Sequence, residues 1–240
     1  MTPTAPQRPR ALTRAAWSLV MIGAALAAPA ALPAALEAVT SKDAAGGLRA
    51  ALSQGIDTAV AQLGARNGFL NDPKVAIALP PALEKADRAL RLLGMGADAD
   101  DLRAGLNHAA ESAVADAKPV FKQALQSMSV ADAKQILTGG DDAGTQYFRR
   151  ATSTVLSARF KPIVAKETAK LKLASVYDRY AGKAASLGLV SAQDSNVNDY
   201  VTAKALDGLF SRIADEERAI RKDPLGQASS LIKKVFGALQ

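Results

Sequence analysis

Ionisable and aromatic side chains gather on two stretches with helical periodicity, residues 141–160 and 200–224, and their types could form a binding or catalytic site. The first stretch carries Tyr147, Arg149, Arg150 and Arg159, and the second carries Tyr200, Lys204, Asp207, Glu216, Glu217 and Arg221. Ionisable groups held in a cleft are a common mark of functional sites, but ion-pair networks that fix helix register use the same residues. The pattern therefore predicts either a structural network between two helices or a small polar pocket.

The pocket interpretation assigns roles to six candidate ligand-binding residues: Tyr147, Arg150, Arg159, Tyr200, Glu217 and Arg221. Arg150 or Arg159 would bind an anionic head group, because a guanidinium presents several donors in a fixed fork. An aromatic ring of one of the two tyrosines would stack on the ligand. The expected ligand is a small amphiphilic or anionic molecule.

Glu217 interrupts the apolar face of its own helix. Five apolar residues share that face: Leu206, Leu209, Phe210, Ile213 and Ile220. At 100° per residue, Glu217 projects within about 20° of Leu206. A lone ionised carboxylate in a core is costly, so the sequence predicts a buried partner for it. Arg159 projects onto the apolar face of its own helix and is the first candidate for that partner.

Glu217 also allows an enzymatic alternative. If its carboxylate lined an open cleft, it could act as the general acid or base of a hydrolase or lyase. No nucleophile or oxyanion motif accompanies it, so we expect a binding protein without enzymatic activity. We keep the hydrolase or lyase as the alternative.

Metal and cofactor chemistry have little support in the sequence. The chain has no cysteine and one histidine, and His108 with Glu111 three residues later is short of the three or four ligands that zinc takes. Gly94 and Gly96 lack the third glycine of a dinucleotide fingerprint, and Gly139-Gly140 lacks the lysine of a P-loop. We therefore expect no metal and no cofactor.

The N-terminus reads as an export signal. Arg8, Arg10 and Arg14 precede an apolar run over 15–28 and the small-residue site Ala28-Pro29-Ala30. This pattern predicts a signal peptide over 1–30, a flexible linker over 31–42 and a periplasmic protein, with an uncleaved membrane anchor as the alternative. Cleavage would remove three of the 30 basic residues and lower the net charge from +7 to +4. That charge is too small to argue for nucleic-acid binding.

The remaining residues, 43–240, predict a single all-α domain, a bundle of about eight to nine helices. The expected helices cover 43–64, 81–93, 98–117, 120–128, 129–138, 141–160, 163–173, 175–188 and 200–224. Lys118-Pro119 and Lys161-Pro162 are expected to interrupt helices. Ser129 is expected to cap one helix, Asp141 or Asp142 another, and Asn198 or Asp199 the last.

Two segments have other interpretations. Residues 75–79 alternate large and small apolar side chains before two prolines, which predicts an extended strap across the helices, with Phe69 and Leu70 of the preceding loop plugging the core. The tail over 225–240 is amphipathic, with Leu225 and Phe236 on its apolar side. It could pack on the bundle or lie on an anionic membrane surface.

Four long stretches carry a family resemblance: QLGARNGFLNDPKVAIALP, NHAAESAVADAKPVF, ILTGGDDAGTQYFRR and DYVTAKALDGLFSRIADEERAIRKDP. From about residue 44 to residue 236 the chain resembles the bacterial family catalogued as domain of unknown function 4197. The resemblance implies an exported, all-helical protein and supplies no catalytic residues. The leading hypothesis is therefore a non-enzymatic periplasmic protein that binds an envelope protein or a small amphiphilic ligand in a groove between helices.

Overall fold

The computed structural model describes residues 41–80, 84, 91, 96–171, 196–224, 233, 235 and 236. Within these ranges the chain is all-α, without strands, and six helices are defined: α2 (Ser41–Gly64), α4 (Gly96–Val114), α5 (Lys118–Ser127), α6 (Val130–Leu137), α7 (Ala143–Thr168) and α9 (Val197–Lys222). The predicted signal peptide, most of the linker, most of the helix over 81–93 and the helix over 175–188 lie outside the described residues. None of the described helices meets the length and hydropathy required to cross a membrane.

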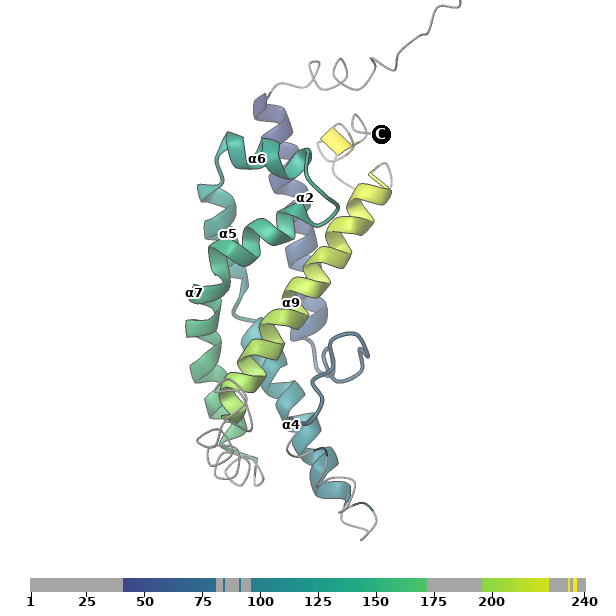
Figure 1. Cartoon of the computed structure of the whole chain (residues 1–240), viewed down its shortest axis with the longest axis vertical. Coiled ribbons are helices and arrows are strands. Elements are labelled where there is room, and N and C mark those ends of the chain that lie inside the picture. Colours follow the sequence, from purple (N-terminus) through teal and green to yellow (C-terminus); the bar gives the residue numbers. More distant parts are fainter. Residues whose placement is uncertain are drawn as a thin grey trace, which may run out of the picture.

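Three long helices, α2, α7 and α9, make most of the contacts between helices. The helix α9 contacts α2, α4 and α7, while α5 and α6 lie against α2 and α7. In Figure 1, α9 crosses in front of the other helices, α5 and α6 lie toward one end, and α4 extends toward the other. The described helices therefore pack around α2, α7 and α9 together, and α9 is one of three central helices.

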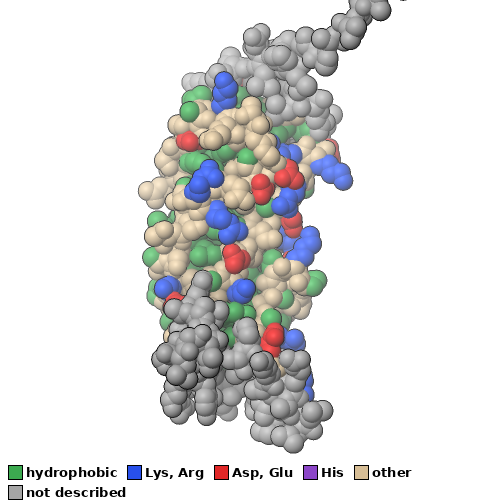
Figure 2. Space-filling model, viewed as in Figure 1, with side chains coloured by type: hydrophobic (Ala, Val, Ile, Leu, Met, Phe, Trp, Pro, Cys, Tyr) green, Lys and Arg blue, Asp and Glu red, His purple; other side chains and the backbone are tan. Residues whose placement is uncertain are grey.

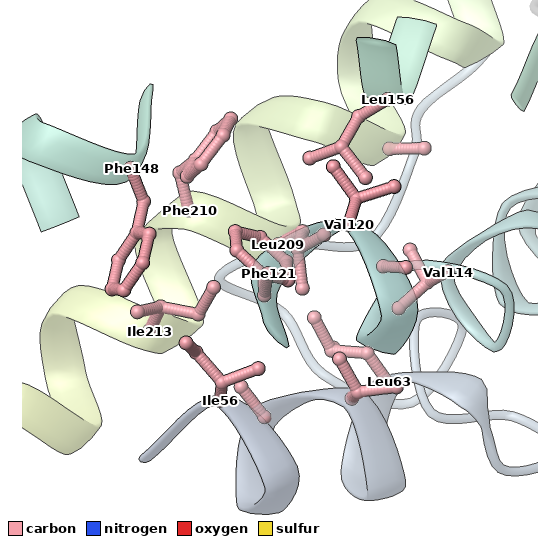
Figure 3. Packing of buried hydrophobic residues seen from close by; sticks show 14 of the residues in the cluster. Ile56, Leu63, Val114, Val120, Phe121, Phe148, Leu156, Leu209, Phe210 and Ile213 are labelled. Carbon is pink, nitrogen blue, oxygen red and sulfur yellow. The ribbon is translucent and has the colours of Figure 1, made fainter. Parts of the chain in front are cut away.

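Aromatic rings and alanines fill the core. Phe121 of α5 packs edge-on against Phe148 of α7 at 5.4 Å and against Phe210 of α9 at 6.1 Å between ring centroids. Figure 3 shows these rings beside Leu209 and Ile213. On α4, by contrast, Ala109, Ala110 and Ala113 are completely buried, as is Ala117 at the N-cap of α5. The phenylalanines supply buried area, and the small residues let helix backbones come close.

The structure corrects the predicted break at Lys161-Pro162, because α7 continues through Pro162 to Thr168. A proline inside a helix removes one N–H and displaces the carbonyl four residues earlier. Both Pro162 and Ala158, which carries that carbonyl, are exposed. On the opposite face Phe160, Val164 and Thr168 are buried at helical spacing. The buried face therefore holds the helix together across the proline.

The segment predicted as a strap over 75–79 contains neither helix nor strand, and its first residue, Val75, lies in a turn in which its N–H donates to Asp72 O at 3.1 Å. The Asn107 side chain on α4 accepts from Ile77 N (2.8 Å) and donates to Ile77 O (2.9 Å), as a neighbouring strand would. The Tyr200 hydroxyl donates to Ala78 O at 3.2 Å. Phe69 of the preceding loop is fully buried, and Leu70 is half-buried. Side chains from two helices, Asn107 of α4 and Tyr200 of α9, thus make hydrogen bonds to backbone groups of this segment, which has no neighbouring strand among the described residues.

The helix caps are partly as predicted. Ser129 and Asp132 form a complete capping box at the start of α6. The N-cap of α9 is Asn196 rather than Asn198 or Asp199, because its side chain accepts from the backbone N–H of both of those residues. Asp142 holds the N-cap position of α7, but its side chain makes no capping hydrogen bond.

Candidate functional site

Glu217 lies buried on α9 at the start of α7. One carboxylate oxygen accepts from Gly144 N at 2.9 Å, and the other accepts from Thr145 N at 2.8 Å and Thr145 Oγ1 at 2.9 Å. Gly144 and Thr145 occupy the first turn of α7, where backbone N–H groups have no acceptor inside the helix. Glu217, 72 residues after Thr145, therefore caps α7 in place of its own Asp142.

Arg221, one turn further along α9, supplies the opposite charge. Its Nε and Nη2 lie 3.2 Å and 2.9 Å from Oε1 of Glu217. The same Nη2 donates to Ile136 O at 2.9 Å, in the last turn of α6. A cation is favoured at a helix C-terminus and a carboxylate at a helix N-terminus. The pair therefore joins the end of α6, the start of α7 and the last turns of α9.

The prediction that Arg159 is the partner of Glu217 was wrong. Arg159 is exposed and pairs with Asp116 at 3.4 Å, far along α7 from Glu217. Helical periodicity placed Glu217 in the core correctly, and it is 4% exposed. The periodicity could not show that the partners would be backbone amides and an arginine on the same helix.

The other predicted site residues have separate contacts. The Tyr147 hydroxyl donates to Ala124 O at 3.2 Å, and burial raises the pKa of Tyr147. Arg150 is exposed. Tyr200 is buried beneath the strap, with the Lys204 ammonium 5.7 Å from its ring centroid. Of the six candidates, only Glu217 and Arg221 contact each other through the described interactions.

A narrow groove runs beside this pair, between α2 and α9. Its lining residues are Ala51, Leu52, Gly55, Ile213, Glu217, Ile220 and Phe236. Its volume is about 250 Å³ when counted out to its open mouth, and the enclosed part holds no more than about one water molecule. The sequence predicted a polar groove, whereas this lining is apolar except for Glu217, whose oxygens are already occupied.

Phe236, from the C-terminal part of the chain, forms one wall of the groove. Val235 and Phe236 are 4% and 3% exposed, so both side chains pack on the helices. The guanidinium of Arg221 lies 5.4 Å from the Phe236 ring centroid, within the range of a cation–π contact. The described part of the predicted amphipathic tail therefore packs on the bundle.

A second buried carboxylate, Glu111 on α4, was missed in the sequence. It accepts from the backbone N–H of Asn67 and Phe69, both at 3.1 Å, and of Leu70 at 3.4 Å. Asn67 has φ of 64°, in the left-handed region. His108 Nε2 lies 2.9 Å from Asn67 Oδ1 and 4.0 Å from Glu111 Oε2. Glu111 thus holds the loop that carries Phe69 into the core.

Metal-binding and surface features add little to this site. The described residues hold no group of three or more His, Cys, Asp or Glu side chains that could bind a metal ion. On the face in Figure 2, basic and acidic side chains are interspersed. The described ion pairs include Arg149–Asp207 at 3.1 Å and Arg218–Asp141 at 3.4 Å. The chemistry available at Glu217 is therefore hydrogen bonding that joins helices beside an apolar groove.

A family model described as "Protein of unknown function (DUF4197)" matches residues 38–237. The chain belongs to this family. The match confirms the resemblance seen in the sequence and covers every described helix. No curated protein and no solved structure matched the chain.

Proposed function

We propose that this chain is an exported, non-enzymatic binding protein that holds an apolar group of a partner in the groove between α2 and α9. The observation that carries the proposal is the groove itself. Leu52, Ile213 and Ile220 present aliphatic walls next to a single charged pair, Glu217 and Arg221. Binding sites for small ligands combine an apolar lining with few polar groups in this way. The bound group would be part of an envelope protein or of a small amphiphilic molecule.

The contacts of Glu217 weigh against the hydrolase or lyase alternative. A general base needs a carboxylate oxygen that faces the substrate. Both oxygens of Glu217 accept hydrogen bonds from Gly144, Thr145 and Arg221. A carboxylate used in this way supports the joining of helices rather than proton transfer.

The packing of the tail weighs against the membrane-surface alternative. A surface helix binds a bilayer through its exposed apolar residues. Val235 and Phe236 are buried on the bundle, so they would have to leave it before they could enter a membrane. Liposome flotation of the chain with and without residues 225–240 tests this alternative, and the groove proposal predicts no flotation in either case.

Export is part of the proposal and rests on the N-terminal sequence. The basic residues Arg8, Arg10 and Arg14, the apolar run over 15–28 and the small residues at 28–30 fit a cleaved signal peptide. A periplasmic destination brings the groove within reach of envelope proteins and amphiphiles. Mass spectrometry of the N-terminus of the protein purified from its own cells tests this part, with cleavage after about residue 30 as the expected result.

Native mass spectrometry of the protein purified from its own envelope tests the groove. A Cβ built at Gly55 makes only ordinary contacts, 3.4 Å from Glu216 Cβ and 3.8 Å from Ile220 Cδ1, so Gly55→Leu should fill the groove without breaking the helix. The matched control is Gly46→Leu on the same helix, where a Cβ meets nothing within 4 Å. We expect a bound molecule or subunit on the native chain and on the control, and at least tenfold less on Gly55→Leu. Equal occupancy on all three, or none on the native chain, contradicts the proposal.

A further inference from the structure

Glu216, one position before Glu217 on α9, is a second carboxylate at the edge of the groove. A Cβ built at Gly55, which lines the groove from α2, would lie 3.4 Å from the Cβ of Glu216. At 100° per residue, Glu216 projects about 60° from Ile213 and Glu217 about 40° from it in the opposite direction. The aliphatic stripe that α9 presents to the groove therefore has a carboxylate on each side.

The two carboxylates differ in what they contact. Both oxygens of Glu217 accept hydrogen bonds, whereas Glu216 takes part in no hydrogen bond and no ion pair among the described residues. The Glu216 side chain is half-buried, and burial raises the pKa of its carboxyl. The guanidinium that acts on it, that of Arg212, is already paired with Asp72. A cation placed beside Glu216 would therefore be favoured, because it would compensate a partly desolvated charge.

An anionic ligand has less support at this groove. Arg150 and Arg159, which the sequence assigned to an anionic head group, are exposed on α7 and do not line the groove. Within the described part of the chain, the basic side chain beside the groove is Arg221. Its guanidinium already donates to Glu217 and to Ile136 O. An anionic head group would thus meet carboxylates on both sides of the aliphatic stripe.

We propose that the groove between α2 and α9 binds a small amphiphile with an unbranched alkyl chain and an ammonium head group, and that Glu216 receives the head group. This inference rests on the proposed function and names the ligand class of the same site. The alkyl chain would lie against Leu52, Ile213 and Ile220, which form the aliphatic walls. Charge complementarity with the unpaired carboxylate of Glu216 selects the positive head group.

The size of the groove favours a single alkyl chain. Its volume of about 250 Å³, counted out to the open mouth, is below the roughly 300–1,000 Å³ of common ligand pockets. The enclosed part holds no more than about one water molecule, so the occupant would lie along the groove instead of entering a deep cavity. A narrow, unbranched chain meets this requirement better than a ring system or a folded protein segment does.

Three probes with the same ten-carbon chain test the choice of head group: decylammonium, decanol and decanoate, titrated into the native chain below their micelle concentrations by isothermal calorimetry. We expect decylammonium to bind about tenfold more tightly than decanol, because a hydrogen bond between charged groups is added, and decanoate to bind most weakly. Equal affinities for the three probes, tighter binding of decanoate, or no binding of decylammonium overturn the proposal.

Glu216→Gln tests the residue itself, because it removes the charge and keeps the shape of the side chain. It should weaken decylammonium binding about tenfold and leave decanol binding unchanged. Since burial raises the pKa of Glu216, removing its charge should not unfold the protein. The matched control is Asp207→Asn, the same change of charge on α9 at an exposed residue that pairs with Arg149. Native affinity in Glu216→Gln, or an equal loss in Asp207→Asn, shows that Glu216 does not receive the head group.

Gly55→Leu separates this inference from the proposed function. It should abolish binding of both decylammonium and decanol, because the added side chain fills the groove. If it does so but the head group makes no difference, the groove takes alkyl chains of any charge, so the ammonium proposal is wrong while the proposed function stands. If Gly55→Leu binds decylammonium as tightly as the native chain, the probe binds elsewhere and this inference is wrong.

The molecule found on the native chain in its own envelope supplies the last comparison. A bound amine with an alkyl chain supports both proposals. A bound protein subunit leaves the proposed function standing and overturns the ammonium amphiphile. If nothing is bound but the probes behave as expected, the proposed function fails and the selectivity of Glu216 for a cation stands.

Discussion

Glu217 on α9 and Glu111 on α4 are each 4% exposed, and each accepts hydrogen bonds from backbone amides of a segment far away in the sequence. The donors at Glu217 belong to the first turn of a helix, and Arg221 supplies a positive charge at 2.9 Å. The donors at Glu111 belong to a loop that contains Asn67 in the left-handed region. The basic side chain described beside Glu111 is that of His108, whose Nε2 lies 4.0 Å from the carboxylate.

The difference between the two sites lies in what each one joins. The Glu217 pair connects α6, α7 and α9, so breaking it exposes charges and amides where three helices meet. Glu111 connects α4 to one loop, so breaking it frees that loop and its buried Phe69. We therefore expect loss of Glu217 to act on the whole body and loss of Glu111 to act locally.

Glu217→Ala should have the largest effect. It leaves Arg221, Thr145 and two helix N-terminal amides without their acceptor, and removing one partner of a buried ion pair costs about 3–5 kcal/mol. Denaturation by urea measures the loss. The control is Asp207→Asn on the same helix, an exposed ion-pair residue that should change stability by less than about 1 kcal/mol. A loss at Glu217 no greater than at Asp207 would break the comparison.

Glu111→Ala should come next, with a loss of up to about 3 kcal/mol, because it leaves one buried amide, that of Phe69, and two partly buried amides without an acceptor. Hydrogen exchange of Asn67 and Phe69 should accelerate at least tenfold, because local opening of the loop becomes easier. The amides of Gly144 and Thr145 should keep their protection. If those amides lose protection to the same degree, the two carboxylates are not independent and the local interpretation of Glu111 fails.

Gly144→Ala tests the Glu217 site separately, because the added methyl group crowds Glu217 and does not touch the Glu111 site. A Cβ there would lie 2.5 Å from Leu52 Cδ2, and 3.1 Å and 3.2 Å from the two oxygens of Glu217. Such overpacking should cost about 1–2 kcal/mol. The matched control, Gly46→Ala in open space on α2, should instead add up to about 1 kcal/mol through helix propensity. Thermal unfolding of both variants checks the opposite signs, and equal signs would be inconsistent with the close approach at Gly144.

Glu216, the neighbour of Glu217, should show the smallest effect. Burial raises the pKa of the Glu216 carboxyl, the Arg212 guanidinium lowers it and the Asp215 carboxylate raises it. The unfolded chain therefore loses the Glu216 proton at a lower pH than the folded chain does. As the pH rises from about 4.5 through the folded pKa, ionisation of Glu216 lowers the free energy of unfolding. Glu216→Gln should therefore be more stable than the native chain at pH 7, by less than about 1 kcal/mol for this half-exposed group, with a smaller gain at pH 4. Melting temperatures at the two pH values measure this, and a larger gain at pH 4 contradicts it.

Much of the fold could be predicted from apolar spacing and cap residues. The periodicity of α9 placed Glu217 in the core, and proline and capping signals placed the boundaries of α5 and α6. The break at Pro162 was wrong because a sequence does not show which face of a helix meets solvent. The buried residues on the opposite face of α7 decided that outcome.

The candidate site was harder to predict because its donors are backbone amides, which every residue except proline carries. Arg221 could have been chosen over Arg159, since residues four apart on a helix lie side by side. Glu111 had a weaker signal. On α4, Ala109 and Ala113 form a narrow buried stripe, and Ala110 and Val114 widen this stripe to within about 60° of Glu111. The burial of Glu111 therefore requires neighbouring elements on both faces of α4.

Hydrogen exchange at the amides of Gly144 and Thr145 tests the central claim most directly. First-turn amides of a helix have no intrahelical acceptor and normally exchange fast. If Glu217 caps α7 from another helix, both amides are protected in the native chain and lose at least tenfold of that protection in Glu217→Gln. Fast exchange of these two amides in the native chain would contradict the account.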